Sequence, residues 1–84
     1  MITARQTRAA RALLGWTQET LAERALVSLT ALKRLESQND LKVYESTADQ
    51  IRRTLEGAGI VFLTSDRGEG VMIVQSDNTR TPPS

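Results

Sequence analysis

The sequence predicts a mainly α-helical protein in which four short helices are followed by a C-terminal β-hairpin. Ser and Thr residues precede several amphipathic segments, where their side-chain oxygens can accept hydrogen bonds from the first backbone N–H groups of a helix. Glycines follow the first and the last of these segments, and after Gly59 the helical periodicity gives way to short runs rich in β-branched residues. We therefore expect a helical domain over residues 1–58, a hairpin over residues 59–76 and a disordered tail over residues 77–84.

The first helix is expected to begin after Thr3 and to end at Gly15. Gln6 stands three residues after Thr3, which is the spacing of a capping box, and glycine readily adopts the left-handed conformation that ends a helix. At about 100° per residue an apolar side and a basic side separate. The apolar side is expected to contain Gln6, Ala10, Leu13 and Leu14, and the basic side Arg5, Arg8 and Arg11.

Two short helices are expected between Gln18 and Glu36, with a tight break between them. Thr17 and Ser28 are the expected caps, and because they lie only eleven residues apart, neither helix can be long. Leu26 lies where the first of these two helices should end in a left-handed residue, a position that usually holds Gly or Asn. We expect either a strain of about 1 kcal/mol at this leucine or a slightly different turn.

A fourth helix is expected after the polar run that follows Glu36, which we interpret as an ordered loop. Ser46 or Thr47 can cap this helix, and Gly57 and Gly59 mark its end. Its apolar stripe is expected to contain Ala48, Ile51 and Leu55.

The hairpin is predicted by two apolar, β-branched runs, Ile60 to Thr64 and Val71 to Gln75, joined by the six-residue loop SDRGEG. Both faces of both strands are apolar, whereas an isolated hairpin should have one polar face. The helices can cover one face, and we expect a second copy of the chain to cover the other, by edge pairing or sheet stacking. The side chains expected at this homodimer interface are Ile60, Phe62, Val71 and Ile73. The alternative is a monomer in which both faces pack against the first and fourth helices.

Composition excludes most catalytic chemistry. The 84 residues contain neither Cys nor His, which removes thiol nucleophiles, imidazole bases and the usual zinc ligands. We therefore expect no enzyme activity, no cofactor and no metal site. No apolar run approaches the roughly 20 residues of a membrane helix, and the N-terminus does not have the pattern of a signal peptide, so we expect a cytoplasmic protein without membrane contact.

Charge is unevenly distributed along the chain. Residues 1–34 carry six basic and two acidic side chains, hence +4, and residues 35–84 carry five basic and eight acidic ones, hence −3, which together give the net +1. The first segment is therefore the candidate for contact with phosphates. Solvated helix faces explain a similar count equally well.

The helix expected after Ser28 has one side to bury and one to present. Ala31, Leu32 and Leu35 share the first side, and Leu29, Thr30, Lys33 and Arg34 lie on the second. In a DNA major groove, Arg34 can pair with guanine through two hydrogen bonds, Thr30 can bond a base or a phosphate, and Leu29 can contact a thymine methyl group. Lys33 can bond either a base or a phosphate. The alternative is that both charges are merely solvated and the leucine packs locally.

Thr17 and Gln18 are further candidates for DNA contact. They begin the second helix, where free backbone N–H groups and the positive end of the helix dipole favour a phosphate, although Thr17 is also the expected cap. Two short helices around a tight break, the second with a basic outer face, have the layout of a helix-turn-helix. The usual partner of that motif is duplex DNA.

The stretch WTQETLAERALVSLTALKRLES resembles the helix-turn-helix of the Cro and phage-repressor type, often called the XRE family. The shared features are Gln18 at the start of the second helix, Leu21 and Ala22 in its core, Val27 and Ser28 before the third helix, and Leu32, Leu35 and Glu36 at its end. The resemblance covers roughly residues 3–55 and implies a four-helix DNA-binding domain of this type over residues 1–58.

The resemblance also implies roles for individual residues. Gln18, Ser28 and Lys33 would contact the DNA backbone, and Leu29, Thr30 and Arg34 would read bases. Two departures stand out, because the family usually has Gly where this chain has Leu26, and commonly has Gly and Pro in place of residues 37–40. Asn39 and Lys42 are further candidates for DNA contact in that loop.

Together with the expected homodimer, these features predict a sequence-specific regulator of transcription, more specifically a repressor. It would bind an inverted-repeat operator in double-stranded DNA with the third helix in the major groove. Two other functions stay open. One is the antitoxin of a toxin–antitoxin pair, which represses its own operon and binds the toxin through the hairpin or the tail. The other is a protein-interaction module that has kept the helix-turn-helix fold without binding DNA and docks on another regulator.

Overall fold

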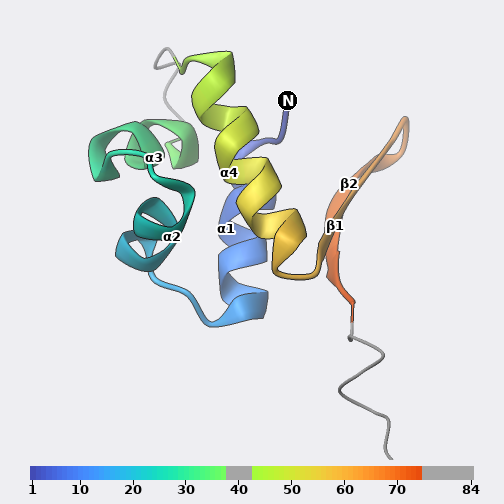
Figure 1. Ribbon diagram of the computed structural model, residues 1–84. Coiled ribbons are helices and arrows are strands. Elements are labelled where there is room, and N and C mark those ends of the chain that lie inside the picture. Colours follow the sequence, from blue (N-terminus) through green and yellow to red (C-terminus); the bar gives the residue numbers. More distant parts are fainter. Residues whose placement is uncertain (38–42, 75–84) are drawn as a thin grey trace, which may run out of the picture.

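The computed structural model describes residues 1–37 and 43–74 (Figure 1). Over these residues it contains helices α1 (Ala4–Leu14), α2 (Gln18–Ala25), α3 (Leu29–Glu36) and α4 (Glu45–Gly57), and strands β1 (Ile60–Ser65) and β2 (Gly68–Ile73). The two strands pair antiparallel. The expectation of a mainly helical chain with a C-terminal hairpin is thus confirmed.

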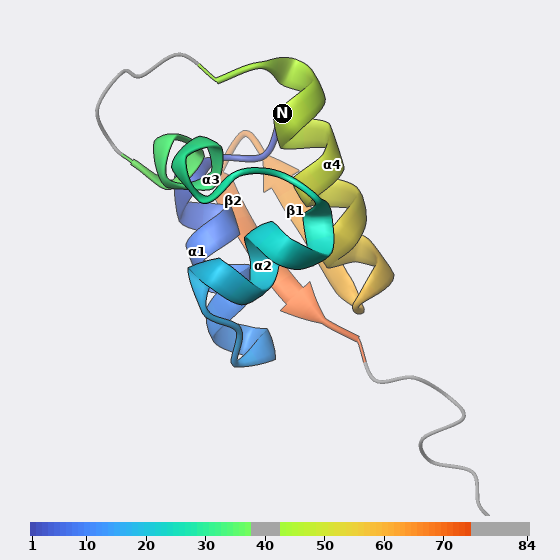
Figure 2. The same cartoon turned by 60° about the vertical axis from the view of Figure 1, so that its left-hand side comes forward.

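The elements form three layers. Helices α1 and α4 form the middle layer, with α2 and α3 on one side of them and the hairpin on the other (Figures 1 and 2). Strand β2 packs on α1, and strand β1 packs on α4. The largest side chains that are fully buried are Leu21, Leu32, Ile51, Leu55, Ile60 and Thr7.

The predicted caps of the first three helices are confirmed. At α1, Thr3 and Gln6 form a complete capping box, with both hydrogen bonds 3.1 Å long, and Gly15 ends the helix at φ 70°. At α2 and α3, the hydroxyl oxygens of Thr17 and Ser28 each accept a hydrogen bond of 3.0 Å from the backbone N–H three residues later. The local capping signals therefore set the starts of these helices.

The start of α4 differs from the prediction. Its N-cap is Tyr44, which makes no side-chain capping bond, so the predicted caps Ser46 and Thr47 lie inside the first turn. The backbone N–H groups of Thr47 and Ala48 both donate to the Tyr44 carbonyl, so the helical hydrogen bonds begin before either hydroxyl could cap. The predicted stripe of Ala48, Ile51 and Leu55 is buried, as expected.

The buried side of α1 is rotated relative to the prediction. Gln6, Thr7 and Ala10 are buried, whereas Leu13, expected on the apolar side, is 45% exposed. At 100° per residue the buried direction is centred between Gln6 and Thr7, which moves Leu13 to its border. The cause is tertiary, because the neighbours of α1 in space, β2 and α3, select which side is covered.

The hairpin turn is shorter than predicted. The strands continue to Ser65 and resume at Gly68, so a two-residue turn of Asp66 and Arg67 replaces the expected six-residue loop. The Ser65 hydroxyl supports this turn by accepting a hydrogen bond of 3.1 Å from the Arg67 backbone N–H. Four strand residues, Ser65, Gly68, Glu69 and Gly70, fall in the expected loop because glycine and glutamate are poor strand formers.

Helix α1 fixes the hairpin through polar contacts. The buried Gln6 amide donates hydrogen bonds of 3.1 Å to the carbonyls of Leu63 and Gly70, one on each strand. Nearer the turn, Glu69 accepts from the Thr3 hydroxyl at 3.1 Å and from Arg5 at 2.9 Å. Because each buried polar group thereby finds a partner, the hairpin has a defined position on the helices.

The residues predicted to form a dimer interface face the chain's own core, and this part of the prediction is corrected. Ile60 is only 2% exposed and belongs to the core, and Phe62, Val71 and Ile73 pack against that core. Side chains alternate between the faces of a strand, so the opposite face carries the remaining apolar residues. These are Val61, Leu63, Met72 and Val74, and they are exposed. The tail at residues 77–84 and the loop candidates Asn39 and Lys42 lie outside the described residues.

Candidate nucleic-acid interface

Helix α3 presents a polar, cationic face to solvent. Thr30, Lys33 and Arg34 are exposed, while Leu32 and Leu35 on the opposite side are buried. The division of the helix into a buried and a presented side is the one that the sequence predicts. Leu29 is the exception, since it is only partly exposed and packs against the core, which leaves part of its side chain for an external contact.

The three arginines of α1 are all occupied within the protein. Arg5 pairs with Glu69 on the hairpin, Arg8 donates to the backbone carbonyl of Glu36, and Arg11 forms two hydrogen bonds of 2.7 Å to the Glu36 carboxylate. The sequence predicts this basic side, and in the structure its arginines make contacts within the protein. Little of its charge is left for a phosphate.

The other arginines outside α3 in the four helices are occupied as well. On α4, Arg52 pairs with Asp49 and Glu56, and Arg53 pairs with Asp49 at 2.9 Å. The hydrogen bond from Arg52 lowers the pKa of Asp49 and raises that of Arg52, which keeps both charged. On α2, the guanidinium of Arg24 lies 4.8 Å from the centre of the Trp16 ring, within the range of a cation–π contact.

Lys33 and Arg34 are thus the helical cations without an internal partner. Among the described residues, neither takes part in an ion pair, a hydrogen bond or a ring contact. They lie one residue apart on the exposed side of a single helix, together with the hydroxyl of Thr30. This face can therefore offer two positive charges and a hydroxyl to an anionic or hydrogen-bonding partner.

A buried carboxylate holds the elements behind this face together. Glu36 ends α3, is 5% exposed, and accepts hydrogen bonds from Arg11 of α1 and, at 3.0 Å, from the Gln18 amide of α2. Arg11 also donates to the Trp16 carbonyl at 3.2 Å. The bond with Glu36 raises the pKa of Arg11, against the opposing effect of burial. The contact fixes the start of α2 relative to the end of α3.

The start of α2 is only partly free. The Thr17 hydroxyl oxygen caps the helix at Thr20, and one amide hydrogen of Gln18 is engaged by Glu36. Gln18 is half-buried and retains a second amide hydrogen and its backbone N–H, neither bonded to a described group. Ser28 is exposed, and its hydroxyl oxygen accepts from Ala31, so its O–H can still donate outward.

A hollow of about 250 Å³ opens beside the presented face of α3. Its lining combines α3, its cap and the start of α4: Ser28, Thr30, Ala31, Arg34, Val43, Tyr44 and Thr47. Tyr44, the N-cap residue of α4, is 70% exposed. Because it lines the same hollow as Arg34, it becomes an additional candidate for contact.

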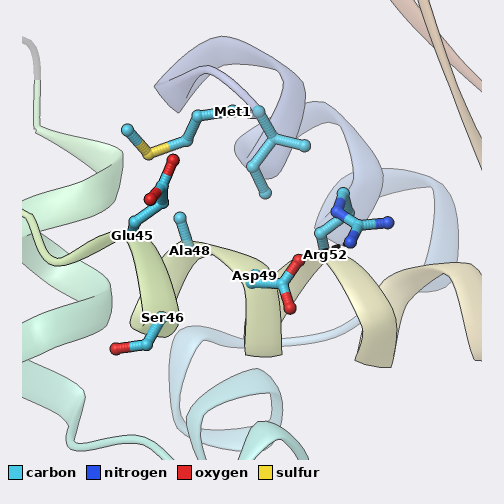
Figure 3. A pocket seen from close by; sticks show the side chains of 7 residues that line it. Met1, Glu45, Ser46, Ala48, Asp49 and Arg52 are labelled. Atoms are coloured by element: carbon cyan, nitrogen blue, oxygen red, sulfur yellow. Dashed lines mark hydrogen bonds and ion pairs between the residues drawn. The ribbon is translucent and has the colours of Figure 1, made fainter.

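A larger hollow, of about 420 Å³, lies on a different surface, between the N-terminal residues and α4 (Figure 3). Met1 and Ile2 supply apolar lining, and the carboxylates of Glu45 and Asp49 and the guanidinium of Arg52 supply charges. In Figure 3 the Arg52 guanidinium lies next to Asp49, with which it pairs. Its positive charge is neutralised there, so this hollow offers less to an anionic ligand than the face of α3.

The buried polar residues that connect α3 to α1 and α2 are not identified from the sequence. Arg11 and Glu36 are 25 residues apart, and nothing local connects them. One signal is available from the helical wheel of α3. With Leu29 at 0°, Glu36 lies at about 340°, between Leu29 and the buried Leu32 at 300°. An acid on the buried side of a helix requires a cationic partner.

A search of protein-family models and a search of curated proteins each found nothing that matches this chain. No helix among the described residues is long and apolar enough to cross a membrane. The function proposed below is therefore supported by the side chains and their contacts alone.

Proposed function

We propose that the protein is a sequence-specific regulator of transcription that binds double-stranded DNA through α2 and α3, used as a helix-turn-helix. The observation that supports this most directly is the presence of Lys33 and Arg34, unpaired and adjacent, on the exposed side of α3, while the arginines of α1 and α4 are bound internally. The exposed face offers hydroxyl, guanidinium and ammonium groups. Such groups form hydrogen bonds with base edges and phosphates. Repression is the mode expected when such a protein covers a promoter.

In this proposal α3 enters the major groove. Arg34 pairs with a guanine through two hydrogen bonds, and Thr30 bonds a base or a phosphate. The exposed part of Leu29 contacts a thymine methyl group. Tyr44, which lines the same hollow as Arg34, would add a contact to a phosphate.

The backbone contacts come from the edges of the motif. Ser28 donates its hydroxyl, Gln18 donates its remaining amide hydrogen, and Lys33 adds a positive charge. The first free N–H groups of α2, beside Thr17, also point to where a phosphate would lie. Such contacts fix the register of the protein on the duplex without carrying sequence information.

The test begins with the selection of binding sites from a pool of random duplexes, followed by affinity measurements with three variants. Arg34→Ala should cost about 1 to 3 kcal/mol on the selected site and relax the preference at one base pair. Gln18→Ala should weaken selected and scrambled duplexes by a similar factor. Arg67→Ala is the control, because it removes an equal charge at the hairpin turn, and its affinity should stay close to that of the wild type.

Two results would overturn the proposal. One is a pool that yields no enriched sequence, and the other is an Arg34→Ala protein that binds the selected site as tightly as the wild type. An equal loss for Arg34→Ala and Arg67→Ala would mean that only net charge matters, which also contradicts sequence-specific reading by α3.

A further inference from the structure

The outer face of the hairpin is an exposed apolar surface that no described part of the chain covers. Val61, Leu63, Met72 and Val74 are between 37% and 48% exposed. Val61 lies directly opposite Met72 in the strand register, and Val74 is bonded to Gly59 at the base of the hairpin. The four side chains therefore form one continuous patch.

This face carries no charged side chain. The residues that alternate onto it along the two strands and just beyond β2 are Val61, Leu63, Ser65, Gly68, Gly70, Met72 and Val74. Charges occur only at the turn, on Asp66 and Arg67, and on Glu69, which faces the helices and bonds Thr3. A surface without charge at its centre and with charges at its rim has the composition of a protein–protein contact.

Gly70 gives a second, independent indication of an external occupant. Its φ is not in the left-handed region, and a Cβ built there would meet no atom within 4 Å, so neither backbone conformation nor packing within the chain requires glycine. Glycine weakens a strand interior and often marks a close approach of another backbone or a ligand. Gly70 lies opposite Leu63 on the outer face, so that approach would come from outside the chain.

The composition of the ten residues after Val74 does not suit them to cover the patch. The ten residues that follow Val74, QSDNTRTPPS, contain no aliphatic or aromatic side chain apart from two prolines. The outer edges of β1 and β2 form no backbone hydrogen bond with another described segment. A sheet whose exposed face is apolar and whose two outer edges are unpaired can pack against another sheet.

We propose that this outer face joins two copies of the chain into a two-fold dimer, sheet against sheet. The face is self-complementary, because Leu63 projects directly beside the space left by Gly70. About a two-fold axis, the Leu63 of each copy fills the space over the Gly70 of the other. In a two-fold dimer both copies use the same patch, so each chain needs to supply only one projecting side chain, Leu63, and one open space, at Gly70.

The size of the patch predicts a modest affinity. The four apolar side chains expose on the order of 300 Å² per chain, against roughly 800 Å² per partner in a stable interface. The remainder has to come from the strand backbone and the turn, so the dissociation constant is expected in the micromolar range, on the order of 1 to 100 μM.

The dimer leaves the proposed DNA-reading face free. The hairpin and α3 lie on opposite sides of the α1–α4 pair, so docking through the hairpin puts the two α3 helices at the outer ends of the dimer (Figures 1 and 2). This consequence rests on the proposed function, in which each copy would contribute one α3 helix to an inverted-repeat site. The dimer itself does not depend on DNA binding.

Light scattering and sedimentation equilibrium of the protein without DNA, from 1 to about 200 μM, test the dimer. The average mass of the wild type should rise across this range from the 9.3 kDa of the monomer toward twice that value. Met72→Glu places a charge in the patch, and Gly70→Val fills the space that the partner's leucine needs. Each should raise the dissociation constant by about tenfold or more.

Leu13→Glu is the matched control for Met72→Glu, since Leu13 is 45% and Met72 48% exposed but Leu13 lies on α1. It should leave the dimer intact. Circular dichroism melts accompany each variant, and Gly70→Val should fold as well as the wild type, because its side chain extends into open space. If Gly70→Val does not fold, the comparison of Met72→Glu with Leu13→Glu decides alone.

A wild type that stays at 9.3 kDa throughout the range overturns the proposal and leaves a different partner protein as the occupant. A dimer that persists in both hairpin variants overturns it too, because the copies then meet elsewhere. Neither result bears on DNA binding, which the random-pool selection measures separately. A monomeric protein that still enriches one sequence would refute only the dimer.

Discussion

At the scale of single residues, Leu26 shows how a local rule can be broken without changing the fold. It occupies the left-handed position after α2 at φ 59°, where a residue with a side chain is strained. Because Leu26 is 83% exposed, packing of its side chain offsets little of this strain. The backbone N–H of Leu26 still bonds the Glu23 carbonyl at 3.3 Å, and that of Val27 bonds the Ala22 carbonyl at 3.0 Å. The helix end therefore forms as it would with glycine, at a cost in free energy.

This geometry predicts that Leu26→Gly stabilises the protein. The substitution should raise the free energy of unfolding by about 1 kcal/mol, because glycine adopts positive φ without strain. Urea unfolding followed by circular dichroism measures the effect. The control is Leu13→Gly, at an exposed position inside α1, which should destabilise by about 1 kcal/mol. Shifts of the same sign for both variants would contradict the strain argument.

At the scale of elements, the helices are locally specified but are joined by buried polar contacts. Glu36 connects α3 to α1 and α2, and Gln6 connects α1 to both strands. Among the described residues, no buried side-chain polar atom is without a hydrogen-bond partner. The relative placement of the elements therefore depends on a small number of polar residues.

The Arg11–Glu36 contact should dominate the effect of charge removal. Glu36→Ala leaves the Arg11 guanidinium without its carboxylate in a site where the two side chains are 19% and 3% exposed, and it should lower the free energy of unfolding by about 3 to 5 kcal/mol. The matched control is Glu56→Ala, which removes an exposed pair with Arg52 and should cost less than about 1 kcal/mol. Denaturant unfolding of both variants gives the comparison. Similar losses would show that burial does not distinguish the two pairs.

At the scale of the whole molecule, function depends on where unpaired charge is left. The net charge of +1 is a poor guide, because most arginines of the helices are bound by acids, a carbonyl or a ring. Within the described helices, the positive charge that remains without a partner is on α3, at Lys33 and Arg34. Attraction to DNA should therefore be strong at that surface and weak elsewhere.

This concentration predicts a specific salt dependence of DNA affinity. The logarithm of the binding constant should fall linearly with the logarithm of salt concentration, with a slope of about −0.9 per phosphate neutralised. Lys33→Ala should reduce the slope by about one for each chain bound, hence by about two if the proposed dimer occupies the site. Fluorescence anisotropy titrations between 50 and about 200 mM salt measure it. A slope unchanged in Lys33→Ala would remove this lysine from the phosphate contacts.

Much of the fold was predictable, because its signals are local. The caps at Thr3, Thr17 and Ser28 act on N–H groups three residues away, and the stripe of α4 is a matter of spacing along one helix. The departures have one local cause and one tertiary cause. Helix α4 begins at Glu45 although its first hydroxyls come later, and Leu13 is exposed because other elements cover a different side of α1.

The sequence by itself determined the type and order of the elements and the presented side of α3, since capping bonds and helical periodicity act within about four residues. Only the tertiary structure decided which charges stay free and which hairpin face is covered. Arg11 meets a carboxylate 25 residues away, and the inner strand face packs on helices formed by the first half of the chain. These contacts depend on chain segments that approach one another only in space, so no spacing along the sequence encodes them.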